Sequence, residues 1–139
     1  MAKTITHTEV FKNTAPKALY DLYMDPEKHT HIIGGPAKIT NREGDSFSAH
    51  NDYITGRNLR LVDGKLIVQT WRTQGWKTED IDSIFILTLE PQGNDTVMTM
   101  VHANIPDEQV ASIDKGWYDH YWNPWKQHLA GQQITRPQM

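Results

Sequence analysis

The chain contains no cysteine among its 139 residues, so disulfide bonds and thiolate chemistry are excluded. It has no dense run of lysine or arginine and a formal net charge of −3, so nothing in it indicates a nucleic-acid partner. No apolar stretch is long enough to span a membrane, and the first residues, MAKTITHTEVF, lack the apolar segment of a signal peptide. We therefore expect a soluble, cytoplasmic protein with one sizeable core.

The sequence also lacks the short motifs of common catalytic and metal sites. It has no GxSxG, no P-loop, no Rossmann fingerprint and no HExxH. His29 and His31 are the closest histidine pair, but residues two apart on a helix do not face each other, so no metal site is expected. His50 and Asp52 would share one face of an expected strand and could form an acid–base pair, although this spacing is common. The pattern predicts no catalytic residue and no cofactor.

Large aromatic side chains are what the sequence has instead. The hydrophobic fraction is 37%, below the globular average, but five tryptophans and five tyrosines compensate in area. The stretch IVQTWRTQGWKTEDIDSIFILTL, residues 67–89, places Trp71 and Trp76 near the end of a strand. Each indole buries a large surface and carries an N–H that needs a partner. Such side chains fill a core, line a pocket or anchor an interface.

The pattern along the chain predicts one strand, two short helices, about six strands and a long C-terminal helix. TITHTEVF alternates β-branched and polar residues, as a strand does. Residues 16–35 show helical spacing, Pro26 divides them into two helices, and a Gly-Gly pair ends the second. The later strands are expected at 36–41, 45–53, 55–62, 65–73, 83–90 and 95–103.

Turn residues link the later strands. REGD, DGK and PQGND each place a glycine beside polar residues, as hairpins require. Short strands at hairpin spacing favour an antiparallel meander.

The C-terminal helix is expected from Pro106 to about Ala130. Four apolar residues at steps of four share one helical face, namely Ile113, Trp117, Tyr121 and Trp125. Tyr118 and Trp122 lie on a flanking stripe and are expected to be more exposed, where they could anchor a partner. Pro124 should bend the helix.

This order of elements resembles the helix-grip fold of the START-like superfamily, also called SRPBCC and birch-pollen-allergen-like. Periodicity alone predicts only the α+β class, in which the long helix covers the apolar face of the sheet. Residues 53–129 resemble the family of the activator of the heat-shock-protein-90 ATPase. The resemblance is carried by YITGRNLRLVDGKLIVQTWR, SIFILTL, DTVMTMVHANIP and GWYDHYWNPWKQHL. We expect one domain over residues 1–131 and a loose tail over 132–139.

The resemblance implies that the faces of SIFILTL and TVMTMVH point to the helix, across an internal cavity. The predicted ligand-binding residues are Trp71, Phe85, Leu87, Met98, Met100, His102, Trp117 and Tyr121. Each has an alternative role in the core, and a histidine on an apolar stripe is most often a satisfied core residue. Arg72 either pairs with a carboxylate of residues 79–82 or anchors an anionic ligand.

Three functions are compatible with the sequence. The leading hypothesis is a non-enzymatic protein that encloses a small hydrophobic or amphipathic molecule between the sheet and the helix. The resemblance implies a second, a module that contacts a chaperone. The third is a cyclase-like or hydrolytic enzyme, because fold does not dictate function. A cavity favours the first, a filled interior with an exposed aromatic patch the second, and a buried acid–base pair the third.

Overall fold

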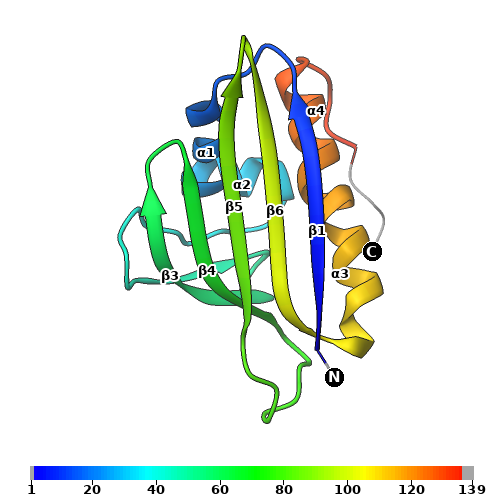
Figure 1. Ribbon diagram of the computed structural model, residues 1–139. Coiled ribbons are helices and arrows are strands. Elements are labelled where there is room, and N and C mark those ends of the chain that lie inside the picture. The colour runs from blue at the N-terminus through cyan, green and yellow to red at the C-terminus, as the bar shows by residue number, and fades with distance from the viewer. Residues whose placement is uncertain (1, 136–139) are drawn as a thin grey trace.

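The computed structural model of the protein describes residues 2–135, which form a curved sheet with all helices on one face (Figure 1). The elements are β1 (Ala2–Phe11), α1 (Pro16–Met24), α2 (Pro26–Ile33), β2 (Ser46–Ala49), β3 (Ile54–Val62), β4 (Leu66–Thr73), β5 (Ser83–Gln92), β6 (Asp95–Pro106), the 3-10 turn η1 (Asp107–Gln109), α3 (Val110–Trp117), the π-helical turn η2 (Tyr118–Trp122) and α4 (Asn123–Leu129). The expected α+β helix-grip fold is confirmed.

The six strands are ordered β1-β6-β5-β4-β3-β2, and every pair is antiparallel. Strands β2 to β6 therefore form the expected meander, and β1 closes the sheet beside β6. Buried and partly exposed residues alternate along β4, β5 and β6, because successive side chains of a strand point to opposite faces. The buried set faces the helices and forms the core.

Two expected strands differ from the structure. Residues 36–41 contribute only an isolated bridge, between Lys38 and Ser48. The strand expected at 45–53 stops at Ala49, since His50, Asn51 and Asp52 adopt left-handed backbone angles with φ of 53°, 56° and 66°. Asparagine, aspartate and histidine are the side chains that tolerate this conformation best. The acid–base pair expected of His50 and Asp52 on one strand face is therefore wrong, because no strand places them there.

Helices α1 and α2 follow the sequence expectation closely. The Asp25 side chain caps α2 by accepting hydrogen bonds from the backbone N–H of Glu27 at 2.9 Å and of Lys28 at 3.1 Å. Pro26 begins α2, and Gly34 ends it with a φ of 83°, which only glycine adopts without cost. The two short helices close one end of the sheet's concave face (Figure 1).

The C-terminal helix contains a π-helical turn, and this turn corrects one expectation. In η2 the N–H of Asn123 bonds to the carbonyl of Tyr118, five residues earlier. Pro124 follows directly; it has no N–H, and its ring conflicts with the carbonyl four residues before it, so the helix widens here. The extra residue rotates Trp122 inward, where it is fully buried and stacks on Trp117 at 5.4 Å. The expectation that Trp122 is exposed is wrong for this reason.

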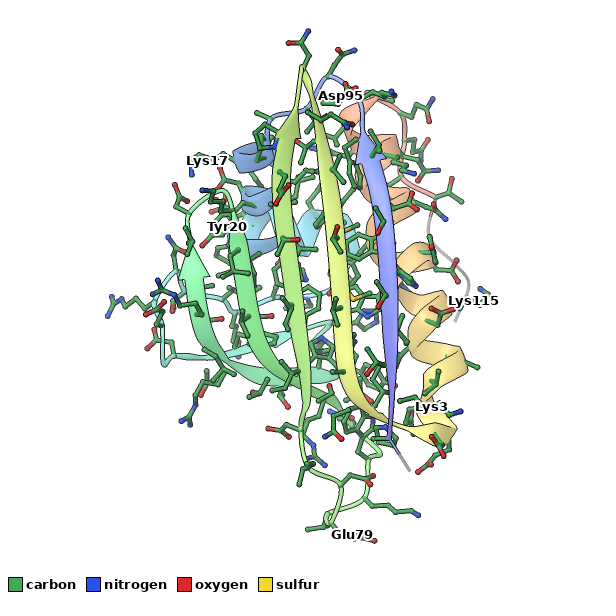
Figure 2. The ribbon with its side chains drawn as sticks, viewed as in Figure 1. Lys3, Lys17, Tyr20, Glu79, Asp95 and Lys115 are labelled. Carbon is green, nitrogen blue, oxygen red and sulfur yellow. The ribbon has the colours of Figure 1, made fainter. Side chains whose placement is uncertain are left out.

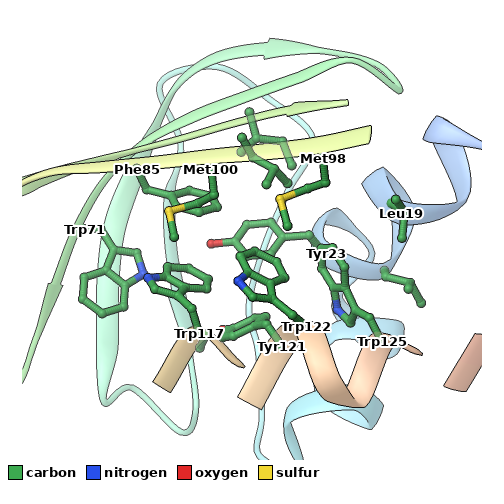
Figure 3. Close-up of a cluster of buried hydrophobic side chains, with 14 of the residues drawn as sticks. Leu19, Tyr23, Trp71, Phe85, Met98, Met100, Trp117, Tyr121, Trp122 and Trp125 are labelled. Atoms are coloured by element: carbon green, nitrogen blue, oxygen red, sulfur yellow. The ribbon is translucent and has the colours of Figure 1, made fainter. Parts of the chain in front are cut away.

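The core is a layer of aromatic and sulfur-containing side chains between sheet and helix (Figure 3). Phe85, Met98 and Met100 descend from β5 and β6 toward the helix aromatics and have no exposed surface. Phe85 stacks on Trp117 with ring centres 4.8 Å apart. This packing binds the second half of the C-terminal helix tightly to the sheet.

Charged side chains lie on the outside, where Lys3, Lys17, Glu79, Asp95 and Lys115 point away from the protein (Figure 2). Lys17 bonds to both Asp21 and Asp63 at 3.2 Å. Within residues 2–135, no helix has the length and apolar character needed to cross a membrane. The expected tail begins with Gln132, whose N–H bonds to the carbonyl of Gln127 at 2.8 Å, while residues 136–139 lie outside the described part.

Replacing Trp117 with alanine should lower the free energy of unfolding by about 3–5 kcal/mol, the range for emptying a large aromatic site. Its indole is 2% exposed and stacks on both Phe85 and Trp122. Urea denaturation measures the loss. As a control, Ile81→Ala should change stability by less than about 0.5 kcal/mol, because Ile81 is 72% exposed. A loss below about 1 kcal/mol for Trp117→Ala would contradict the central role given to this side chain.

Candidate functional site

Three aromatic residues of the C-terminal helix donate hydrogen bonds to three buried histidines. Trp117 bonds to His102 on β6, Trp122 to His7 on β1, and Tyr121 to His29 on α2. The three histidines lie on three separate elements, so their hydrogen bonds fix the helix at three points. We call these side chains the histidine anchors, defined as His7, His29 and His102.

His102 has both ring nitrogens occupied. Its Nδ1 lies 3.0 Å from Trp117 Nε1, and because an indole nitrogen only donates, Nδ1 must accept. Its Nε2 therefore carries the proton and donates to Ser83 Oγ at 2.8 Å, and Ser83 in turn donates to the Trp71 carbonyl at 2.5 Å. A connected chain of hydrogen bonds thus links the helix to β6, β5 and β4.

His7 forms a short contact with a carboxylate that resembles a catalytic pair. Its Nε2 lies 2.6 Å from Asp114 Oδ1, while Trp122 Nε1 donates to its Nδ1 at 3.0 Å. A general base needs a free nitrogen to receive a proton from a substrate. His7 has none, since the indole occupies one nitrogen and Asp114 the other. The pair is structural.

His29 completes the set with no exposed surface. Its Nδ1 donates to the Tyr23 carbonyl at 2.8 Å, and its Nε2 accepts from the Tyr121 hydroxyl at 2.9 Å. The neighbouring Tyr23 hydroxyl donates to Gln69 Oε1 at 2.8 Å, and Gln69 donates to Asn58 at 2.9 Å. These polar groups are buried, but each has a hydrogen-bond partner. Their burial therefore carries little free-energy cost, and the network favours a single arrangement of the side chains.

Burial shifts the pKa of two anchors far below the ordinary value. Desolvation, together with a smaller effect of the nearby His7, lowers the pKa of His102 to about 3. Desolvation also lowers the pKa of His29 to about 4, opposed by its bond to the Tyr23 carbonyl. Both imidazoles are therefore neutral at pH 7, in agreement with the hydrogen bonds they accept.

A cavity of about 320 Å³ opens between the first half of the C-terminal helix and strands β3 and β4. Its inner wall is apolar and aromatic, and its mouth carries polar groups. The lining residues are Ile33, His50, Tyr53, Ile54, Trp71, Thr73, Gln109, Ser112, Ile113, Gly116, Trp117, His120 and Tyr121.

The cavity uses some of the eight side chains that the sequence indicates for ligand binding and leaves others in the core. Trp71, Trp117 and Tyr121 line it. The other five side chains lie outside the lining and have no exposed surface; these are Phe85, Leu87, Met98, Met100 and His102. The cavity therefore lies nearer to β3, β4 and the β2–β3 turn than to the β5–β6 stripe that the sequence indicated.

Trp71 both packs in the core and lines the cavity. Its indole is 4% exposed, and its ring meets those of His102 and Trp117 at 4.6 Å and 5.8 Å. Within the described residues, its Nε1 is covered and has no hydrogen-bond partner. The adjacent Arg72 donates to Asp82 at 2.9 Å and covers the ring of Trp76 at 5.6 Å. Arg72 thus pairs with a carboxylate of the 79–82 stretch, the first of its two expected roles.

Two residues at the mouth are absent from the ligand-binding set that the sequence predicts, although His50 was a candidate for an acid–base pair with Asp52. His50, from the left-handed turn, and His120, from η2, place their rings 5.5 Å apart. Neither imidazole has a hydrogen bond within the described part of the chain, and both are half-buried. Only the tertiary structure joins them, and the one sequence signal was the unusual His-Asn-Asp turn.

Comparison with known proteins agrees with this fold. Residues 13–130 match the model of the family described as activator of Hsp90 ATPase homolog 1-like protein. The chain belongs to this family. A curated relative from Dictyostelium discoideum, named as an activator of the 90 kDa heat shock protein ATPase homolog, is 29% identical over 83% of this chain. The chain spans only 30% of that relative's length.

Solved structures show the same fold at low sequence identity. An HSP90 activator from Plasmodium falciparum superimposes with a TM-score of 0.85 at 20% identity, over 94% of this chain and 98% of its own. The Aha1 dimer structure from Colwellia psychrerythraea gives a TM-score of 0.69 at 17% identity, over 82% and 87% of the two chains. At these identities the likeness establishes the architecture of the Hsp90-activator-like family and leaves the function to be argued from the site.

The histidine anchors should make the protein sensitive to mild acid. An unfolded histidine has a pKa near 6.5, whereas His29 and His102 have folded values of about 4 and 3. Between these values the unfolded chain binds more protons, so stability is full above about pH 6.5 and falls as the pH drops. His29 and His102 should each lower the free energy of unfolding by up to about 1.4 kcal/mol per pH unit between pH 6 and 4.5.

Urea titrations at pH 7.5, 6.0 and 5.0 would measure this dependence. The His102→Gln variant should be less stable than the wild type at pH 7.5. Its free energy of unfolding should fall less on acidification, because the histidine with the lowered pKa has been removed. His128→Gln removes an exposed histidine from α4 and should leave the slope unchanged. Equal stability of the wild type at pH 7.5 and 5.0 would contradict the neutral state assigned to His29 and His102.

Proposed function

We propose that this protein binds a small apolar or amphipathic molecule in the cavity beneath α3, without catalysing a reaction. The observation that carries this proposal is the cavity itself, about 320 Å³ with Trp71, Trp117 and Ile113 on its wall. Pockets that take small ligands commonly measure about 300–1,000 Å³ and are mainly apolar with a few polar groups. This cavity is at the small end of that range, which favours a compact ligand over a large one.

The helix residues at the cavity also support binding. Gly116 lies inside α3, where glycine costs about 1 kcal/mol relative to alanine. A Cβ built there would meet only His120 Cδ2, at 3.8 Å. The helix is therefore less stable with glycine at position 116, but a larger side chain there would reduce the volume of the cavity. This choice of residue supports a role for the open space.

Binding is favoured over catalysis by the state of the polar groups. The histidine anchors have both ring nitrogens occupied by protein partners. In the described part of the chain, no aspartate or glutamate is fully buried, so the buried acid–base pair that would favour an enzyme is not formed there. Location in the cytoplasm is part of the same proposal.

Contact with a chaperone is a second candidate, supported by the printed names of the Dictyostelium and Plasmodium relatives. A docking surface would be expected to gather exposed apolar side chains. Among the described residues the large exposed ones are Val10, Tyr53, Leu59, Ile81 and Leu129, which come from five separate segments. The cavity therefore supports the first candidate more directly than the surface supports the second.

Filling the cavity from the helix side should abolish ligand binding without unfolding the protein. A thermal-shift screen of planar aromatic compounds, fatty acids and sterols should yield hits, since a ligand at one hundred times its dissociation constant adds about 2.7 kcal/mol of stability. Bound ligand should alter the tryptophan fluorescence, because Trp71 and Trp117 form the wall. Gly116→Leu should lose both signals and keep a melting temperature close to that of the wild type.

Ala111→Leu is the matched control, because it adds similar bulk to an exposed position of the same helix outside the cavity. It should bind as the wild type does. Equal binding by the Gly116→Leu variant would place the ligand elsewhere, and a screen without any hit would refute the ligand proposal.

Chaperone contact has its own test. If that candidate holds, the purified protein should capture the 90 kDa heat-shock chaperone of its organism in a pull-down and raise its ATPase rate. Gly116→Leu should not affect this capture, because the substitution leaves the outer surface unchanged. No capture and no change in ATPase rate would exclude this role for the isolated chain.

A further inference from the structure

We infer that the ligand of this cavity is a small aromatic carboxylate, whose ring lies against Trp71 and Trp117 and whose carboxylate meets His50 and His120 at the mouth. The inference rests on the proposed function and goes beyond it by naming the chemical class. It follows from the aromatic wall, from the two unbonded imidazoles and from the charges around the cavity.

The wall favours a flat ring. The ring centres of Trp71 and Trp117 lie 5.8 Å apart, with ring planes inclined by 38°. The ring centre of Tyr121 lies 4.7 Å from that of Trp117. Aromatic rings bind one another by offset stacking and edge contacts, which add to the area that they bury. Ile54 and Ile113 complete an inner wall with no charged group.

The mouth favours an anion. Within residues 2–135, histidine is the only lining residue type that can become positively charged, and no acid, lysine or arginine lines the cavity. A bound cation would therefore face no opposite charge, whereas an anion would face two imidazoles. Each ring has nitrogens that no described residue engages, so a carboxylate can accept hydrogen bonds from both.

The backbone at the mouth is held in a costly shape. Three consecutive non-glycine residues, His50 to Asp52, have positive φ, and each left-handed residue costs roughly 1–2 kcal/mol. Surrounding bonds maintain the turn, including Asn51 N–H to the Pro36 carbonyl at 3.0 Å and Gln74 Nε2 to the Asp52 carbonyl at 3.2 Å. Strain of this kind gathers at binding sites, where it positions a side chain. Here it holds the ring of His50 against that of His120.

Proton uptake should accompany binding. Burial lowers the pKa of His50 and of His120, and the nearby His50 also lowers the pKa of His120, so both are neutral in the empty protein at pH 7. A carboxylate favours the charged form of its neighbour, so it raises their pKa on binding. The affinity for a carboxylate ligand should thus increase as the pH falls through the pKa that His50 and His120 have in the complex.

Few other charges face this pair. The titratable and charged groups around it are His29 in the core, Tyr53 in the turn, Tyr121 on the helix, and the ion pair of Lys115 with Asp119. Asp119 raises the pKa of His120 and Lys115 lowers it, so the two charges of this ion pair act in opposite directions. The two imidazoles therefore dominate the pH dependence of the mouth.

Calorimetric titration with 2-naphthoic acid and its neutral isostere 2-naphthamide tests the inference. The acid should bind the wild type about tenfold more tightly at pH 6 than at pH 8, with proton uptake visible as a dependence on buffer ionisation enthalpy. The amide should show no such change. The titrations are run in EDTA and repeated with added zinc in place of EDTA. Binding seen only with zinc would overturn the inference in favour of a metal held by the histidine pair.

Two variants remove the imidazoles with little change in backbone. His50→Asn suits the left-handed turn, and His120→Gln suits a helix. Each should abolish the preference for the acid at pH 6 and leave amide binding unchanged. His128→Gln, on an exposed part of α4, should behave as the wild type.

The outcomes separate the two levels of the proposal. If the acid and the amide bind equally at both pH values, or if the variants keep the acid preference, the carboxylate inference fails while ligand binding stands. If neither probe binds and the thermal-shift screen of apolar compounds also gives no hit, the proposed function fails, and the inference fails with it.

Discussion

The buried hydrogen bond from the Trp117 indole to the His102 imidazole is the contact on which the rest of the structure depends. It joins the centre of the helix to the centre of the sheet at 3.0 Å, and both side chains are almost wholly buried. Because an indole can only donate, it dictates the protonation of His102, which then dictates the bond to Ser83 and onward to β4. Removing any member would leave a polar group buried without a partner, at a cost of about 1–3 kcal/mol.

The π-helical turn explains why one half of the helix is packed and the other half is open. It brings Tyr121 and Trp122 inward together, so the aromatic bulk is concentrated from Trp117 onward. Before that point Gly116, Ser112 and Gln109 line the cavity, and these residues are too small or too polar to fill the space. The cavity is therefore the direct consequence of how side-chain volume is distributed along one helix.

Membership of the Hsp90-activator-like family does not by itself assign a function to this chain. The chain spans about 30% of the Dictyostelium relative, and the remainder of that protein has no counterpart in the match. What the chain does contain is a pocket with an aromatic wall and, at its mouth, two imidazoles to which no described residue forms a hydrogen bond. These features support the proposed binding role, whereas the names of the relatives support the chaperone candidate.

The sequence by itself determined the order of elements, the hairpin turns, the break at Pro26 and the inward face of Trp117, because periodicity and turn chemistry report on residues close together in the chain. It also indicated that Arg72 can pair with an acid in the following loop. Only the tertiary structure decided that Trp122 is buried, because regular helical spacing cannot register an inserted π turn. It alone brought His50 beside His120, and it alone showed that the Met98–Met100 stripe fills the core while β3 and β4 form the cavity. These outcomes depend on contacts between distant segments and on the volumes that meet there, and no local pattern contains that information.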